Sequence, residues 1–371
     1  MTKKSKPRKV LRVGFLPEND CASLVVAHEL GWFAEQNLHV ELSRESSCAS
    51  LRDRILQGQL EAAHAPATLP FVLTLGLDFE QANCLSGMVL SLQGNALTIS
   101  QRLQKEGVRD ADTLRRRIFA EWGRRTYTFG VPFPYSAQYF LLCQWLRSAG
   151  IVPHQHARIV VVPPEQMFPT LELGYLDGYC AGEPWNSVAA EAGAGVILTT
   201  SAQLAPLHPE KALLVREDFA RDRADEHECL ISVLREACAF CEQPGNRELI
   251  CAMLAQPKYV NAPVECIRAG FGGALIAPVR SARTPPALNV FCHHDANDPS
   301  AAKSEWVADN LAAVLLPAGG KSGRRPKLNF IFRPDIFERS QRWLREKFRP
   351  PASTRSSTRE KPSLLPSLAP A

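Results

Sequence analysis

Two stretches of the chain carry side chains that could ligate a metal ion. Cys238 and Cys241 have the CxxC spacing of many zinc sites, and residues 292–295 read Cys-His-His-Asp. The first pair lies in a helical pattern, LISVLREACAFCEQ, in which both cysteines take apolar-face positions. The second stretch has no CxxC near it in the sequence. We therefore expect packed, reduced cysteines here, and no metal or cofactor.

Catalytic motifs are missing from the sequence. It has no Gly-rich phosphate-binding loop, no GxSxG elbow and no HExxH helix. Cys48 and His64 are the one pair that an enzyme on this chain could use as reactive groups. The sequence therefore predicts a protein without enzymatic activity.

Functional residues must be positioned by a scaffold, and an internal repeat predicts what that scaffold is. Gly14 and Gly130 each end a strand-like run before a Pro-containing loop and an apolar-periodic helix. Gly58 and Gly174 each end a helix, and Glu61 and Asp177 each precede a short strand of small residues. All three pairs are 116 positions apart, which indicates a duplicated unit.

Each repeat reads strand, helix, strand, helix, strand. This order is typical of α/β architecture, and we expect two lobes, each a mainly parallel sheet flanked by helices. The runs 93–100 and 209–218 are predicted to cross between the lobes. Ligands of such sheets bind beyond the strands' carboxyl ends, which here are the loops 17–23 and 132–138. The expected divisions are a basic arm 1–9, lobe I at 10–99 plus 211–348, lobe II at 100–210, and a disordered Pro/Ser-rich tail 349–371.

Charge and apolar content exclude several classes of protein. Much of the net charge of +5 lies in the first ten residues and after Arg339, so we expect no direct binding of nucleic acid. The 11 cysteines are odd in number and sit in apolar contexts, which argues against a disulfide framework. The basic start leads directly into a strand without a signal-like apolar run, and no window is apolar enough for membrane insertion. We expect a cytoplasmic location.

A resemblance to a known family becomes specific in the middle of the chain. The strings VVVPPEQM, LELGYLDGYCAGEPWN and PEKALLVREDF are similar to those of the NrtA/CmpA-like nitrate- and bicarbonate-binding proteins, and among these to the cytoplasmic nitrate sensors of the NasS type. GEPWN with the downstream PEK is the most specific match. Weaker matches extend the resemblance over most of residues 10–345.

The resemblance implies a type II periplasmic-binding-protein-like fold whose two lobes close over a small inorganic anion, nitrate or nitrite. For the sensors it implies a partner, an ANTAR-type antiterminator protein that is sequestered when the ligand is absent. Nitrate spreads one charge over three oxygens, so its site needs one cation and several neutral donors in a cleft of low dielectric.

The resemblance assigns cleft positions to four residues near the two crossings. Lys211, the Lys of the PEK string, is the candidate cation, although it could also be a surface lysine. Gln93 and Gly94 open the first crossing, where the Gln93 amide could donate to an anion or simply face solvent. Gln138 stands where many relatives carry His, at the start of a helix whose N–H groups point at the cleft.

Five further positions are expected to line or shape the same cleft. Cys48 replaces a Trp that is typical of the family and Ser50 replaces a small residue, so the identity of the anion is open. Pro164 should shape the cleft wall, and Glu183 should pair with a cation such as Lys211 or with backbone donors at a turn. His64 is either a pocket residue or a core histidine.

Two other functions share the same scaffold. One is the solute-binding component of a nitrate, bicarbonate or sulfonate ABC transporter. The other is an enzyme similar to the thiamine pyrimidine synthases, which would depend on Cys48 and His64. Because the fold is common to all three, it does not decide between them.

Overall fold

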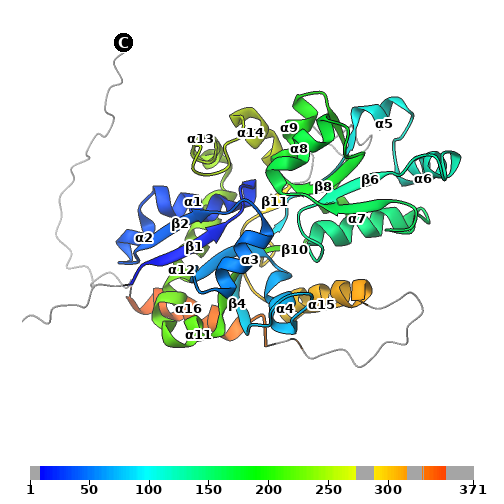
Figure 1. Cartoon of the computed structure of the whole chain (residues 1–371). Helices are drawn as coiled ribbons and strands as arrows, with labels where there is room; N and C mark the ends of the chain where they lie inside the picture. Colours follow the sequence, from blue (N-terminus) through cyan, green and yellow to red (C-terminus); the bar gives the residue numbers. More distant parts are fainter. Residues whose placement is uncertain (1–8, 273–287, 316–327, 329, 348–371) are drawn as a thin grey trace, which may run out of the picture.

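Two lobes, each built around one β-sheet, make up the molecule (Figure 1). The computed structural model describes residues 9–272, 288–315, 328 and 330–347. The predicted tail 349–371 and nearly all of the predicted arm 1–9 lie outside the described residues.

Lobe I contains a six-stranded sheet in the order β11-β4-β10-β3-β1-β2. Its strands are β1 (Leu11–Phe15), β2 (Val40–Arg44), β3 (Ala62–Pro66), β4 (Cys84–Gln93), β10 (Pro209–Arg216) and β11 (Asn289–Val290). Lobe II contains a five-stranded sheet in the order β7-β6-β8-β5-β9. Its strands are β5 (Asn95–Ser100), β6 (Thr128–Val131), β7 (Arg158–Val161), β8 (Gly178–Gly182) and β9 (Gly195–Thr200).

The α/β two-lobed class is confirmed, but the sheets are mixed rather than mainly parallel. β1 pairs in parallel with β2 and β3, and β6 with β7 and β8. The remaining strands pair antiparallel, including β10 with β3 and β5 with β8. The reason is connectivity: a strand that enters a lobe from the other lobe runs against the strands of the repeat.

The first crossing is a break in a long extended segment. The sequence predicted a strand from Gln93, whereas the structure ends β4 at Gln93 and starts β5 at Asn95. Both Gln93 and Gly94 have positive φ, 63° and 96°. A side chain at Gly94 would collide with Asn289, since a Cβ there would lie 2.1 Å from Nδ2. The backbone therefore turns sharply between the two sheets, and only glycine fits at its second position.

Matching contacts in both lobes confirm the duplication. A Cβ on Gly14 would meet Leu60 at 2.6 Å, and a Cβ on Gly130 would meet Leu176 at 2.9 Å. Glu61 accepts a hydrogen bond from the backbone N–H of Arg12 at 2.8 Å, and Asp177 accepts one from that of Thr128 at the same distance. These partners are again 116 positions apart. The repeat therefore extends to the packing of strand against loop.

Helices cover both sheets (Figure 1). In lobe I they are α1 (Ala22–Glu29), α2 (Trp32–Glu35), α3 (Cys48–Leu56), α4 (Leu69–Leu75), α11 (Glu217–Asp222), α12 (Ala224–Glu242), α13 (Arg247–Leu254), α14 (Val264–Gly272), α15 (Ala301–Leu315) and α16 (Pro334–Lys347). In lobe II they are α5 (Gln101–Lys105), α6 (Ala111–Ala120), α7 (Ala137–Ser148), α8 (Met167–Glu172), α9 (Trp185–Glu191) and α10 (Ser201–Leu204). Short 3-10 turns are η1 (Asn19–Cys21), η2 (Pro164–Gln166) and η3 (Pro244–Asn246).

The apolar core connects the two lobes. One cluster includes Phe71 and Val89 of lobe I together with Leu97 and Phe140 of lobe II. Cys238 and Cys241 are buried in a second cluster on α12, as the helical pattern predicted. Among the described residues, no three His, Cys, Asp or Glu side chains are grouped as a metal site would require. None of the described helices has the length and apolarity that a bilayer-spanning segment needs.

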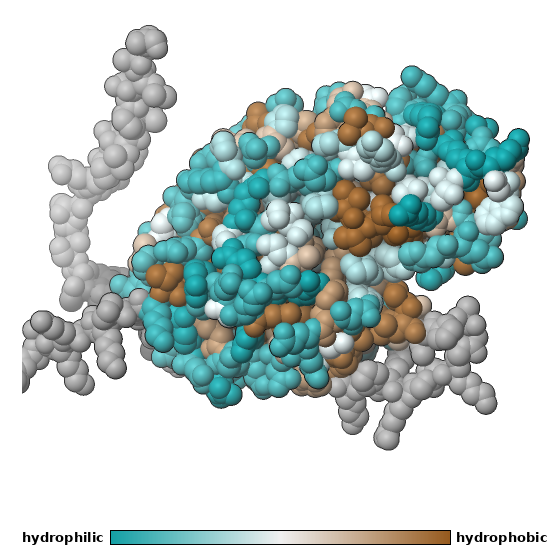
Figure 2. Space-filling model, viewed as in Figure 1, coloured by the Kyte–Doolittle hydropathy of each residue, from teal (hydrophilic) through white to brown (hydrophobic). Residues whose placement is uncertain are grey.

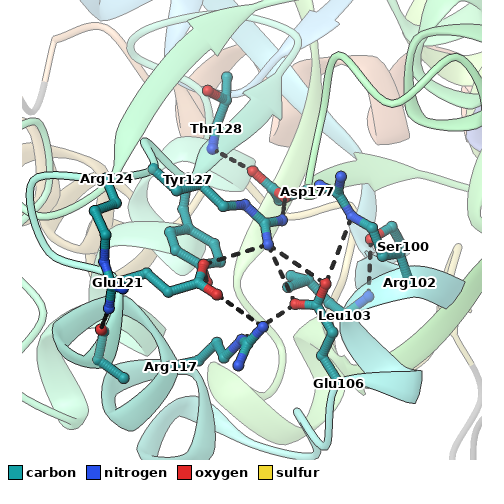
Figure 3. A network of polar contacts seen from close by, with 12 residues as sticks. Ser100, Arg102, Leu103, Glu106, Arg117, Glu121, Arg124, Tyr127, Thr128 and Asp177 are labelled. Atoms are coloured by element: carbon teal, nitrogen blue, oxygen red, sulfur yellow. Dashed lines mark hydrogen bonds and ion pairs between the residues drawn. The ribbon is translucent and has the colours of Figure 1, made fainter.

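Lobe II also carries a network of ion pairs near its surface (Figure 3). Arg102 and Arg125 contact Asp177, and Arg117 and Arg125 contact Glu106 and Glu121. Glu106 and Glu121 are both 22% exposed, and Arg102 is 55% exposed. The network joins α5, α6 and the loops before β6 and β8 with three cations and three carboxylates. It therefore balances charge within its own residues.

Candidate functional site

The centre of the molecule contains a buried lysine surrounded by carboxylates. Lys211, on β10, is fully buried. Its Nζ lies 3.0 Å from Glu18 Oε2, 2.8 Å from Asp20 Oδ2 and 3.0 Å from Glu210 Oε1. These four residues form what we call the Lys211 cluster. The predicted cation is therefore no surface lysine, but all three donors of its ammonium group already have partners.

A local irregularity in β10 brings two adjacent side chains into this cluster. Successive residues of a regular strand point to opposite faces, so Glu210 and Lys211 would not normally meet. The pairing of β10 with β4 shifts register between Pro209 and Lys211 and again between Lys211 and Ala212. Such bulges redirect side chains. They allow the Glu210 carboxylate and the Lys211 ammonium group to share one location.

Lobe II contributes neutral amides to the same place. Gln138 Nε2 donates to Glu210 Oε1 at 2.9 Å and to Asn95 Oδ1 at 2.8 Å. The Asn95 amide in turn donates to Glu210. Gln138 is the second residue of α7, whose N-terminus is capped by Ser136. The prediction that Lys211 and Gln138 share the cleft is consistent with this arrangement, because Glu210 lies between them.

Burial and neighbouring charges give the carboxylates of the cluster different proton affinities. Burial raises the pKa of Glu18 to about 7 and outweighs the attraction of Lys211, and it also raises the pKa of Asp20. Burial opposes ionisation of Glu210 as well, but Lys211 and His208 lower its pKa to about 2. The Lys211 pKa is lowered by burial but raised well above its ordinary value by Asp20, Glu18 and Glu210. Glu210 and Lys211 are therefore the firmly charged pair, and Glu18 is the group that takes a proton near neutrality.

Hydrogen bonds between the lobes enclose the cluster. The N–H of Asn19 donates to the Glu183 carbonyl oxygen at 2.7 Å, and Trp185 Nε1 donates to the carbonyl oxygen of Pro17 at 2.9 Å. Glu18 extends to the end of β8, where a Cβ on Gly182 would lie 2.4 Å from its Oε1. Farther out, Arg44 of lobe I forms an ion pair with Glu165 of lobe II. The molecule is therefore in a closed form, with the loop 17–20 between its lobes.

Several buried acceptors of this region have no hydrogen-bond partner. They are Glu18 Oε1, Asp20 Oδ1, His64 Nδ1 and Gln138 Oε1. Unpaired buried polar atoms are costly and in proteins commonly face a ligand or water. Their grouping around one lysine makes this the candidate binding site.

Glu183 has a different role from the one expected first. It does not contact Lys211; its Oε2 accepts the backbone N–H of Ser187 at 3.1 Å, near the start of α9. Burial raises its pKa to about 7. The alternative expectation, pairing with backbone donors, describes its position. Trp185 packs between the lobes through its bond to Pro17.

Gln93 and Gly94 shape the crossing next to the site. The Gln93 side chain accepts the backbone N–H of Leu207 at 3.1 Å, and the Gly94 carbonyl oxygen accepts that of Glu183 at 3.1 Å. Both residues therefore hold backbone segments in place. The structure gives Gln93 a buried position, 4% exposed, rather than one facing solvent.

Ser50 and Pro164 lie away from the lysine. Ser50 donates to Glu45, which also pairs with Arg54. Pro164 begins η2 and is followed by Glu165, the partner of Arg44, so it belongs to the surface where the lobes meet. Neither residue has a contact with the Lys211 cluster in the hydrogen bonds and ion pairs of the described chain.

Cys48 and His64 border the cluster without the properties of a reactive pair. Cys48 begins α3 and is buried, and burial with the nearby Glu18 charge raises the pKa of its thiol. His64 Nε2 lies 3.0 Å from the Asp20 carbonyl oxygen, and burial lowers the His64 pKa to about 3. A protonated thiol is a weak nucleophile. The pair therefore gives no support to the enzyme alternative.

Sequence reasoning missed Glu18, Asp20, Asn95 and Glu210. Glu18 and Asp20 lie in the loop 17–23 that the repeat placed at the cleft, and Glu210 is part of the PEK string. The expectation of one cation and neutral donors around an anion gave no reason to select the three carboxylates. The signal that could have found them is the burial of a lone cation, which requires compensating carboxylates.

Comparisons with known proteins agree with this architecture. The model of the NMT1-like family matches residues 4–255. The nitrate import ATP-binding protein NrtC of Synechocystis is 35% identical over 309 residues, which are 81% of this chain and 45% of that protein. The nitrate/nitrite binding protein NrtA of Synechococcus elongatus is 28% identical over 322 residues, 84% of this chain and 73% of NrtA. The chain spans about half the length of the NrtC and CmpC relatives it matches.

Solved structures give the same result for the fold. The periplasmic nitrate-binding protein NrtA from Synechocystis matches with a TM-score of 0.82 at 23% identity, covering 90% of this chain and 89% of NrtA. The alkanesulfonate-binding protein SsuA of Xanthomonas axonopodis matches with a TM-score of 0.61 at 17% identity, covering 84% and 96%. The fold is therefore that of the periplasmic binding proteins, with NrtA-like and CmpA-like sequence relatives. This chain belongs to the NMT1-like family, whose model matches more than half of its length.

Proposed function

We propose that this protein binds a small inorganic oxyanion, nitrate or nitrite, in the cleft around Lys211, and that it acts as a sensor rather than as an enzyme. The observation that carries the proposal is the buried Lys211 at the meeting point of the two lobes, with the Gln138 and Asn95 amides beside it. Relatives named as nitrate/nitrite-binding and bicarbonate-binding proteins support the choice of ligand class.

The arrangement suits an anion that joins the two lobes. Lys211 belongs to the sheet of lobe I, and Gln138 and Asn95 belong to lobe II. In the structure these donors bond to Glu18, Asp20, Glu210 and Asn95. An anion between the lobes would therefore gain a charge-assisted hydrogen bond and neutral donors by replacing some of these bonds. Binding of the anion therefore shifts the equilibrium toward the closed form. The size of the shift equals the difference between the anion's binding free energies for the closed and the open form.

The regulatory part of the proposal concerns a partner protein. In it, the closed, anion-bound form releases an ANTAR-type antiterminator that the anion-free form holds, in the cytoplasm. The relatives called import ATP-binding proteins favour a second candidate, in which this unit supplies anion binding to an ABC transporter. Co-purification of tagged protein with and without nitrate distinguishes the two: the sensor yields the antiterminator only without nitrate, and the transporter unit yields transporter subunits instead.

Calorimetric titration tests the ligand. We expect binding of nitrate or nitrite by the purified protein. The affinity of Gln138→Leu should be weaker by about tenfold to about 150-fold, because a lost hydrogen bond to a charged group is worth about 1.5–3 kcal/mol. Gln155→Leu is the matched control, since Gln155 is exposed on lobe II. Hydrogencarbonate serves as the competing ligand. A folded protein that gives no binding signal with any of the three anions would refute the proposed function.

A further inference from the structure

The carboxylates of the Lys211 cluster outnumber its one ammonium group, so the cluster would repel an added anion. One ammonium group faces three carboxylates at 2.8–3.0 Å, inside a region from which water is excluded. An added anion would meet this surplus at low dielectric, where repulsion is strong. It would also find each donor of Lys211 already in use. An anion can therefore bind Lys211 only if one carboxylate is protonated and moves away from the ammonium group.

Glu210 and Asp20 have contacts besides the one to Lys211. Glu210 also accepts bonds from Gln138 and Asn95 and lies 3.3 Å from His208 Nε2. The backbone carbonyl oxygen of Asp20 contacts His64 Nε2 at 3.0 Å, and the Asp20 carboxylate Oδ1 lies 3.7 Å from the same nitrogen. Displacing Glu210 would break hydrogen bonds beyond its contact with Lys211. Beyond Lys211, the Asp20 carboxylate, whose Oδ1 has no hydrogen-bond partner, would lose only its 3.7 Å contact with His64 Nε2.

Glu18 is held more loosely. Its Oε2 contacts Lys211, whereas its Oε1 has no hydrogen-bond partner and faces Gly182 at the end of β8. The charged and titratable groups around it are Lys211 and Glu210 on β10, Asp20 and Cys21 on η1, Cys48 on α3 and His64 on β3. Burial raises its pKa to about 7, so protonation costs little near neutral pH.

We propose that the cleft binds its anion together with one proton. A proton from solvent adds to the Glu18 carboxylate, the neutral carboxyl group leaves Lys211 Nζ, and the anion takes its place. The new O–H of Glu18 then donates to the anion. Charge balances because one proton enters with one negative charge. This inference rests on the proposed function and specifies how the site accepts a weakly basic monoanion such as nitrate, which carries no proton of its own.

Proton uptake on binding can be measured directly. We would titrate the full chain with nitrate at about pH 8, in two buffers of different ionisation enthalpy, and compare the heats. We expect about one proton taken up per nitrate bound. The dissociation constant should be constant below about pH 7 and rise by up to about tenfold per pH unit above it.

Variants separate the proton-linked mechanism from a structural effect. Glu18→Gln carries a permanent donor in place of the carboxylate, so its affinity at about pH 8 should match that of the unaltered protein at about pH 6, without proton uptake. Asp177→Asn is the control, since Asp177 is an almost buried acid paired with arginines in the network of Figure 3, outside the cleft. It should keep the proton uptake.

The failures are distinguishable. Nitrate binding without proton uptake at about pH 8, or uptake that persists in a folded Glu18→Gln protein, overturns this inference and leaves the proposed function standing. Absence of nitrate binding at both about pH 6 and about pH 8 overturns the inference. The hydrogencarbonate and nitrite titrations then show whether the proposed function is also refuted. Circular dichroism of each variant shows that it is folded.

Discussion

Two clusters of cations and carboxylates in this molecule differ in charge balance and in burial. The lobe II network of Figure 3 joins three arginines to three carboxylates and is partly open to solvent. The Lys211 cluster joins one cation to three carboxylates and is at most 3% exposed. The first satisfies its own charges and needs nothing else. The Lys211 cluster buries excess negative charge and unpaired hydrogen-bond acceptors. Such an arrangement costs stability, which indicates a functional site.

The surfaces of the two lobes are consistent with this contrast. Figure 2 shows that hydrophilic residues cover most of the face in view, and that hydrophobic residues gather in smaller patches. Charged side chains at the surface are solvated, so their pairing changes little in free energy. The charges around Lys211 have lost that solvation, so each of them has a large effect on its neighbours. Three measurements test this difference.

The largest effect should come from the lysine itself. Lys211→Met leaves three buried carboxylates without a cation, and breaking a buried ion pair in this way costs about 3–5 kcal/mol of folding free energy. Urea denaturation at neutral pH measures the loss. Adding Glu18→Gln to the variant should restore part of it, because one uncompensated charge is removed. A loss below about 1 kcal/mol would mean that the two clusters do not differ as described.

A smaller effect is expected from Glu18 in the pH dependence of stability. Its pKa is raised from 4.5 to about 7 in the folded protein, so between these values the folded state binds more protons than the unfolded state. The Glu18 contribution to stability is therefore present below about pH 4.5 and is lost as pH rises to about 7, by about 3 kcal/mol. Denaturation curves across this range should show that the free energy of unfolding of Glu18→Gln increases relative to that of the unaltered protein as pH increases. Parallel curves would contradict the prediction.

The smallest effect belongs to the lobe II network. Arg125→Met removes contacts to Asp177, Glu106 and Glu121, but Arg125 is 22% exposed and its partners keep other arginines. We expect a loss of about 1 kcal/mol. The difference from the unaltered protein should shrink at about 1 M salt, where screening acts over about 3 Å. A loss as large as that of Lys211→Met would remove the distinction between the clusters.

The sequence was sufficient to predict most of the secondary-structure elements around the site, but not the tertiary contacts between them. The 116-residue repeat predicted both parallel units because Gly14 and Gly130 mark a packing constraint that is visible in one residue type. Lys211 and Gln138 were predicted to lie near each other because strand ends and helix starts meet at the cleft, and in the structure both contact Glu210. Their role in binding stays a prediction. The strand β4 was not predicted, and the strand predicted from Gln93 begins at Asn95 in the structure.

The carboxylates around Lys211 depend on features without a local signature. Glu18 and Asp20 reach the lysine because the loop 17–20 is held between the lobes by Glu183 and Trp185. Glu210 reaches it because of a bulge in β10. Both are results of tertiary packing, which the alternation of polar and apolar residues does not encode. The assumption that an anion site avoids carboxylates also hid these residues.

The register of the crossing strands places Lys211 and Asn95 at equivalent positions of the two repeats. Lys211 is paired with Pro66 in lobe I, and Asn95 is paired with Gly182 in lobe II. Pro66 and Gly182 are equivalent in the repeat, so Lys211 and Asn95 are the same position in two copies of one ancestral unit. One copy keeps a positive charge there and the other keeps an amide. The duplicated protein thus resembles a dimer whose two half-sites have diverged in side chain at one position. In the proposed function, the lysine would attract the anion and the amide would orient it.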